Sequence, residues 1–195
     1  MKQVLITGFD PFGGEQINPS WEAVKALPDQ IREYQITKLE IPTVFGAAAQ
    51  KVLDAALKLS PDVILCVGQA GGRRAVTPEV VAINLREAGI PDNAGNQPVN
   101  VPVVQDGPTA YFSTVPVREM VQAVRSEELP AALSYSAGAF VCNDVLYRLL
   151  HHFNGTSVRV GFIHVPYLPQ QATNGQPSMP LDQITKALTI AISVL

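Results

Sequence analysis

Apolar positions along the chain follow two periodicities. Short apolar runs, most clearly DVILCVG, have the length and composition of strands buried on both faces of a sheet. Longer stretches such as FGAAAQKVLDAALKL repeat their apolar residues at the spacing of an amphipathic helix. The predicted strands span residues 3–8, 33–41, 62–68, 79–85, 131–136 and 158–165. The predicted helices span residues 19–27, 45–59, 116–126, 145–153 and 181–195.

The alternation of strands and helices predicts the fold class. It is typical of a single-domain α/β fold with an open, mostly parallel twisted sheet and helices on both faces. A chain of 195 residues has the size of one domain, spanning 1–195. The connection between the predicted strands 62–68 and 79–85 is shorter than a parallel crossover requires, so we expect at least one antiparallel strand. Two long loops, roughly 86–110 and 165–180, have the length of functional loops.

Composition and charge narrow the class of protein. Hydrophobic residues make up 47% of the chain and charged residues 16%, which is typical of a globular protein. The formal net charge is −3 without blocks of like charge, so we expect neither a nucleic-acid partner nor a membrane partner. The first residues do not resemble a signal peptide, and the two cysteines form no disulfide framework. Reduced thiols predict a cytoplasmic location.

Cys142 is the first candidate for chemistry. It follows the predicted strand 131–136 across a short loop and lies at the start of a helix, which places it at the carboxyl edge of the sheet. Free backbone N–H groups and the positive end of the helix dipole favour a thiolate there, and such a site lowers a cysteine pKa from ~8.5 to ~3.5–7.5. The alternative is a small buried residue at a tight strand-to-helix junction.

His164 is the second candidate. It lies near the end of the predicted strand 158–165, again at the carboxyl edge, where it could act as a general acid and base. The alternative is a histidine satisfied within the core. His151 and His152 lie in the last turn of the predicted helix 145–153, where a cation suits the helix dipole, so we expect them to be structural.

Glu79 is the third candidate. It begins the predicted strand 79–85, which we expect to run antiparallel to the strand before it, 62–68. The start of this strand then reaches the edge where the preceding strand ends. Glu79 could therefore orient an imidazole at that edge, whereas the alternative is a surface salt bridge with Arg73 or Arg74.

The shared placement of the three candidates changes their interpretation. A cysteine, a histidine and a carboxylate at one edge are the three parts of a thiol hydrolase: nucleophile, proton carrier and orienting group. Ligands of such sheets also bind at the carboxyl ends of the strands. A thiol redox protein would need a second reactive cysteine, but Cys66 lies within an apolar strand and we expect it to be inert.

The turn after the first predicted strand reads TGFDPFGGE. Its glycines, Gly8, Gly13 and Gly14, do not match G-x-G-x-x-G, and no Lys-Ser or Lys-Thr pair follows. This argues against the competing hypothesis of a phosphate- or nucleoside-binding α/β protein. Phe9 and Phe12 either pack under the loop or form an aromatic wall for a flat, neutral ligand group.

Seven segments resemble one known family. They are GFDPFGGE, NPSWEAV, GQAGGR, TPEVVAIN, IPDNAGNQP, SAGAFVCND and GFIHVPYLP, and they occur in family order over most of the chain. The family is pyroglutamyl peptidase I, also called pyrrolidone-carboxylate peptidase. The resemblance implies a cysteine peptidase that removes an N-terminal pyroglutamyl residue from peptides through a thioester acyl-enzyme. It also implies a single catalytic domain, a homotetramer in the cytoplasm, and no cofactor.

The resemblance also implies roles for individual residues. Cys142 matches the family nucleophile, His164 its histidine and Glu79 its acidic member. The residues that match the substrate pocket are Phe9, Phe12, Gln69, Phe140 and Val141. Two positions depart from the family pattern, because Gly89 and Val80 stand where the family often has a basic residue. The first departure concerns a positive charge near the developing oxyanion, and neither alters the three catalytic positions.

Overall fold

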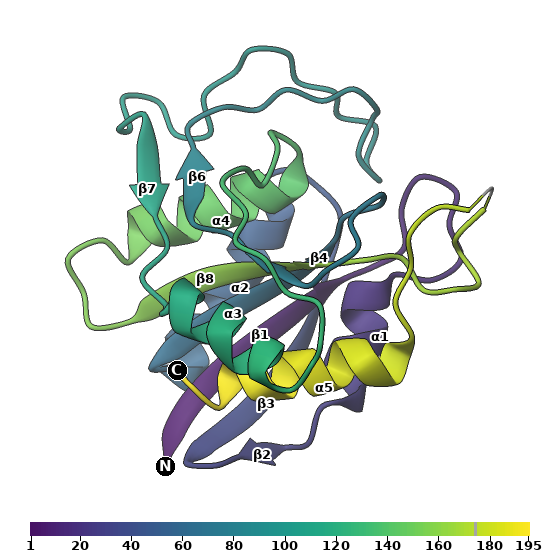
Figure 1. Ribbon diagram of the computed structural model, residues 1–195. Helices are drawn as coiled ribbons and strands as arrows, with labels where there is room; N and C mark the ends of the chain where they lie inside the picture. Colours follow the sequence, from purple (N-terminus) through teal and green to yellow (C-terminus); the bar gives the residue numbers. More distant parts are fainter. Residues whose placement is uncertain (174) are drawn as a thin grey trace.

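A computed structural model describes residues 1–173 and 175–195, and its centre is a six-stranded sheet in the order β2-β3-β1-β4-β8-β5 (Figure 1). The strands of this sheet are β1 (Lys2–Phe9), β2 (Gln30–Ile31), β3 (Tyr34–Ile41), β4 (Val63–Gln69), β5 (Thr77–Pro78) and β8 (Arg159–Val165). Strands β3, β1, β4 and β8 are parallel, whereas the two edge strands, β2 and β5, are antiparallel to their neighbours. The predicted mostly parallel sheet is therefore confirmed.

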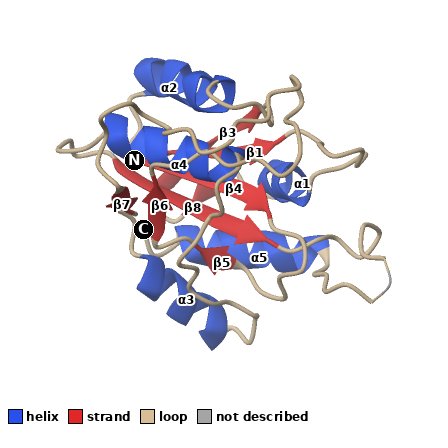
Figure 2. Cartoon of the chain, turned by 90° about the horizontal axis from the view of Figure 1, so that it is seen from above, coloured by secondary structure: helices blue, strands red, loops and turns tan. Residues whose placement is uncertain are grey.

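Within residues 1–173 and 175–195, five helices cover the two faces of the sheet. They are α1 (Pro19–Ala26), α2 (Ala47–Leu59), α3 (Val117–Ser126), α4 (Val141–His152) and α5 (Leu181–Ile192). Helices α2 and α4 pack on one face and α1, α3 and α5 on the other, and each face has its own apolar core (Figure 2). The central strands β1, β4 and β8 are buried on both sides, as their continuous apolar runs predict. No helix among the described residues is long and apolar enough to cross a membrane.

Only part of the predicted strand 79–85 is a strand, and that part lies outside the central sheet, which corrects the expected pairing. The chain pairs with β8 rather than with β4 at Thr77 and Pro78, and then leaves the sheet. Its continuation, β6 (Val81–Ile83), pairs with β7 (Ala110–Phe112) in a separate two-stranded sheet. The expected antiparallel direction is correct, so Glu79 still reaches the carboxyl edge, where its N–H donates to the carbonyl of Phe162.

The predicted strand 131–136 is not a regular strand. It lies along β5 and makes only isolated bridges, Ala131 with Val76 and Ser134 with Glu79. Backbone bonds alternate between the two segments, from Ala132 N to Val76 O and from Ser134 N to Pro78 O. The bond that belongs between these two would come from the N–H of residue 78, which proline lacks, and the ladder resumes where Val80 N donates to Ser134 O. Pro78 therefore interrupts the ladder.

Candidate functional site

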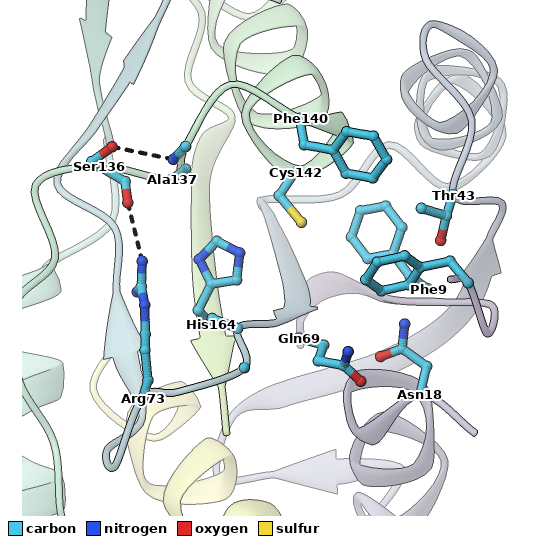
Figure 3. A pocket seen from close by; sticks show the side chains of 14 residues that line it. Phe9, Asn18, Thr43, Gln69, Arg73, Ser136, Ala137, Phe140, Cys142 and His164 are labelled. Carbon is cyan, nitrogen blue, oxygen red and sulfur yellow. Dashed lines mark hydrogen bonds between the residues drawn. The ribbon is translucent and has the colours of Figure 1, made fainter. Parts of the chain in front are cut away.

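A cavity of about 360 Å³ opens at the carboxyl edge of the sheet, beside the N-terminus of α4 (Figure 3). It is lined by Phe9, Phe12, Asn18, Thr43, Gln69, Ala70, Gly71, Arg73, Ser136, Ala137, Gly138, Phe140, Cys142 and His164. Most of these residues come from the ends of β1, β4 and β8 and from the loops around that edge. The edge predicted from the sequence to carry the chemistry is thus the edge that holds this cavity.

Cys142 is the second residue of α4, because the helix begins at Val141, four residues before the predicted start. Its side chain faces the cavity, as does the ring of His164 (Figure 3). The backbone N–H groups of Val141 and Cys142 lie in the first turn of the helix and donate to no other residue among those described. The thiol therefore lies beside free donors at the positive end of a helix.

Gly68 leaves the space that this thiol occupies. A β-carbon on Gly68 would lie 2.9 Å from Sγ of Cys142 and 2.7 Å from Cζ of Phe162, closer than a real Cβ approaches. The end of β4 at this edge can therefore carry no side chain at position 68 without displacing the sulfur.

We expect the Gly68→Ala variant to lose at least about tenfold in kcat/KM, because a small displacement of a reacting atom has a large effect on rate. The same overpacking lowers the free energy of unfolding by about 1–3 kcal/mol. Peptidase kinetics and denaturant unfolding measure the two effects. Gly89→Ala is the matched control, because nothing lies within 4 Å of a β-carbon there. Equal kinetics in both variants would contradict the assigned role of Gly68.

The ionisation of Cys142 differs from the expectation drawn from its helix position. Burial raises the pKa of the Cys142 thiol to about 12, with a further raising effect from the negative charge of Glu79. The charge of Arg73 and the thiol's own backbone N–H lower this pKa, but their effects are smaller. Desolvation therefore outweighs the lowering effects of Arg73 and of this N–H group. The resting thiol is neutral, so an attack by sulfur needs a base to remove its proton.

His164 and Glu79 form a buried pair beside the cavity. The distance between Nδ1 of His164 and Oε1 of Glu79 is 2.6 Å, and the two side chains are 5% and 0% exposed. Burial opposes ionisation of Glu79, but hydrogen bonds from His164, Ser134 and Arg73 hold its pKa below the usual range. Burial also lowers the pKa of His164, against the raising effect of Glu79. A neutral imidazole that donates from Nδ1 keeps its other nitrogen free to accept a proton.

Glu79 contacts Arg73 as well as His164, and it does so as a buried carboxylate rather than at the surface. Nη1 of Arg73 lies 2.8 Å from the same carboxylate oxygen that meets His164. Arg73 also donates to the hydroxyl of Thr77 and to the carbonyl of Ser136, which ties it to two segments around the cavity. The positive charge in this cavity wall therefore comes from Arg73, a role that the sequence does not reveal. Gly89 is not among the lining residues.

Asn143 and Asp144, which follow the cysteine, hold its helix in place. The Asn143 side chain accepts a bond from Ile83 N (3.0 Å) and donates to Ile83 O (2.9 Å), which fastens α4 to β6. Asp144 is fully buried and accepts from Nε of Arg86 (2.7 Å) and from the backbone N–H of Gly46 (2.9 Å). The sequence shows two polar residues here but gives no signal of these distant partners.

Four of the five predicted pocket residues line the cavity, and the fifth lies in the core. Phe9, Phe12, Gln69 and Phe140 line the cavity, as the family resemblance implies. The rings of Phe12 and Phe140 lie 6.2 Å apart and form an aromatic wall. Val141 is fully buried in the core between α4 and the sheet and is not among the lining residues.

Fold and site together define an α/β protein with a partly buried thiol facing a histidine–carboxylate pair. Comparison with known proteins identifies the family. The family model described as pyroglutamyl peptidase matches residues 2–195. The pyrrolidone-carboxylate peptidase of Enterococcus faecalis is 55% identical over 190 residues, covering 95% of this chain and 89% of that protein. That of Bacillus thuringiensis strain Al Hakam is 50% identical over 199 residues, covering 100% and 93%.

Solved structures agree with this relationship. The crystal structure of pyroglutamyl peptidase I from Bacillus amyloliquefaciens matches with a TM-score of 0.96 and 50% identity, over 100% of this chain and 96% of that one. The pyrrolidone carboxyl peptidase from Thermococcus litoralis matches with a TM-score of 0.95 and 37% identity, over 100% and 93%. The chain belongs to the pyroglutamyl peptidase family, and it is an enzyme of that class.

Proposed function

We propose that this protein hydrolyses the bond after an N-terminal pyroglutamyl residue, with Cys142, His164 and Glu79 as its catalytic triad. The observation that carries the proposal is that Cys142 and His164 line one cavity while His164 Nδ1 lies 2.6 Å from Glu79 Oε1. The cavity is lined by one sheet edge and its adjoining loops. This supports a single catalytic domain over residues 1–195.

Acylation begins with a neutral thiol and a neutral imidazole. The free nitrogen of His164 takes the thiol proton while sulfur attacks the carbonyl carbon of the scissile bond. Glu79 stabilises the imidazolium that forms. The carbon–nitrogen bond then breaks, and His164 gives the proton to the departing amine. The pyroglutamyl group remains on Cys142 as a thioester.

The first turn of α4 stabilises the negative oxygen of this intermediate. The free N–H groups of Val141 and Cys142 are preorganised donors, and such donors are strongest where charge develops in a site shielded from water. In the second half of the reaction, His164 takes a proton from water, and the hydroxide adds to the thioester carbonyl. The carbon–sulfur bond breaks, the thiol regains its proton, and pyroglutamate leaves.

The chemistry of the cavity suits a neutral, flat acyl group. Phe9, Phe12 and Phe140 provide apolar walls, and Gln69 provides an amide. Among the described lining residues none is Asp or Glu, so a free α-ammonium group would find no carboxylate in this wall. An N-terminal proline carries that charge and lacks the lactam carbonyl, and a site built for the lactam rejects it because buried polar groups are left unpaired.

Trapping the thioester tests the proposal. We expect acid quenching during turnover of a pyroglutamyl ester, followed by peptide mapping, to find a pyroglutamyl group on the peptide that contains Cys142. The alternative phosphate- or nucleoside-binding function predicts no acylated cysteine. An acyl group on any other residue, or none with turnover under way, would contradict the role of Cys142.

The quaternary structure and location implied by the resemblance remain proposals: a homotetramer in the cytoplasm. Support for assembly comes from apolar side chains that are exposed on the loop between β6 and β7 and on β7 itself. They are Ile90, Val99, Val101 and Phe112, with exposed fractions of 47%, 63%, 40% and 72%. Exposed apolar groups of this kind are common at subunit interfaces. Light scattering of the purified protein measures the assembly state, and a monomer would contradict it.

A further inference from the structure

Gln171 lies behind the cavity wall rather than in it. It belongs to the long loop between β8 and α5 and is only 8% exposed. It is not among the residues that line the cavity. Its Nε2 nevertheless lies 3.0 Å from Oε1 of Gln69, which does line the cavity.

Backbone groups determine which way the Gln171 amide faces. Its Oε1 accepts the N–H of Leu168 at 3.1 Å, and a backbone N–H can only donate. Its Nε2 donates to the carbonyl of Ile17 at 3.2 Å, and a carbonyl can only accept. Nε2 also lies 3.4 Å from a carboxylate oxygen of Glu15. Because the oxygen and nitrogen of an amide are distinguished by their partners, this orientation is specified at both ends.

The orientation of the Gln171 amide fixes the orientation of the Gln69 amide through the hydrogen bond between them. The atom of Gln69 that meets the NH₂ group of Gln171 must be an acceptor, so it is Oε1. The NH₂ group of Gln69 is then turned away from Gln171. It has no hydrogen-bond partner among the described residues, and it lies on the cavity side of the amide (Figure 3). The cavity wall thus presents a free N–H donor at this point.

We infer that Gln171 is a positioning residue for substrate selection, which acts by holding the Gln69 amide with its NH₂ group toward the ring carbonyl of the substrate. The inference rests on the proposed pyroglutamyl substrate. That carbonyl is the acceptor which distinguishes a pyroglutamyl ring from a cyclopentane ring. A reversed Gln69 amide would place oxygen against oxygen, and the same cavity would then disfavour the lactam.

The test uses two covalent probes, pyroglutamyl chloromethyl ketone and its cyclopentyl analogue. Both carry the same reactive group, but the analogue lacks the lactam. The main variant combines Gln171→Glu with Glu15→Gln, which keeps the net charge and size while replacing the NH₂ donor by an acceptor. Gln171→Met is the second variant, and it removes the amide altogether. Gln170→Glu is the matched control, because the side chain of this neighbouring residue is exposed.

We expect both Gln171 variants to react at least about tenfold more slowly with the pyroglutamyl probe, and within about threefold of wild type with the cyclopentyl probe. The control should match wild type with both. Equal slowing with the two probes would show a merely structural role and overturn the inference, as would unchanged selectivity. Failure of the wild-type protein to cleave pyroglutamyl amides would instead contradict the proposed function, so the two failures are distinguishable.

Discussion

We expect the Cys142→Ala variant to lose hydrolysis of a pyroglutamyl coumarin amide by at least about 10³-fold, with its folded structure retained. The physical reason is that the proposed route passes through a bond to sulfur, and alanine has no atom that can form it. Catalytic units of this kind lose about 10³–10⁶-fold when the nucleophile is removed, because only binding and the oxyanion donors remain. Steady-state fluorescence measures the rate, and circular dichroism checks the fold.

Cys66→Ala is the control for this experiment. Cys66 is fully buried in β4, and burial raises the pKa of its thiol to about 12. No histidine is among the groups that shift this pKa. We expect near-normal kcat/KM and a loss of about 0.5–3 kcal/mol in the free energy of unfolding, as for other core truncations. Loss of activity in the Cys66 variant alone would overturn the assignment of the nucleophile.

The Glu79→Gln variant should show the second large effect. The substituted glutamine keeps the shape of the side chain but not its charge, so the imidazolium formed during attack loses its stabilising partner. We expect kcat to fall by about 10²–10⁴-fold. Removal of one partner from this partly buried ion pair also leaves Arg73 uncompensated, which lowers the free energy of unfolding by about 0.5–3 kcal/mol. Kinetics and urea unfolding measure the two losses separately.

A second substitution separates the catalytic loss from the loss of stability. Glu79→Gln combined with Arg73→Met removes the unpaired charge together with the carboxylate, so we expect stability to recover in part. Activity should not recover, because His164 still lacks its carboxylate. Recovery of activity along with stability would mean that Glu79 acts only by holding the fold, and would contradict its proposed catalytic role.

The sequence predicts which side chains gather at the carboxyl edge of the sheet better than it predicts the pairing of the chain around them. Cys142 lies at the start of a helix and His164 lies near the end of a strongly apolar strand. Both features are local signals in the sequence, and both place the residue at the carboxyl edge of the sheet. The prediction of a regular strand at 131–136 is wrong, since the apolar pattern of this segment does not show that its neighbour carries Pro78. Strand pairing depends on the partner as much as on the segment itself.

Residues that support the site are not predicted from the sequence, because their partners also lie in other segments of the chain. Asn143 and Gln171 make their decisive contacts with segments far away in the chain. Polar side chains of this kind have no periodicity, and any of them could lie on a solvated surface. Only the folded chain shows which partner each one meets.

The sequence by itself determined the alternation of strands and helices, the two-sided burial of the central sheet, and the edge at which thiol, imidazole and carboxylate gather. These features follow from apolar periodicity, which is a local property of the chain. The tertiary structure alone decided that burial raises the pKa of the Cys142 thiol, that Glu79 contacts both His164 and Arg73, and that Gln69 turns its NH₂ group to the cavity. Ionisation and amide orientation depend on desolvation and on nearby partners, and both arise only when distant segments pack together.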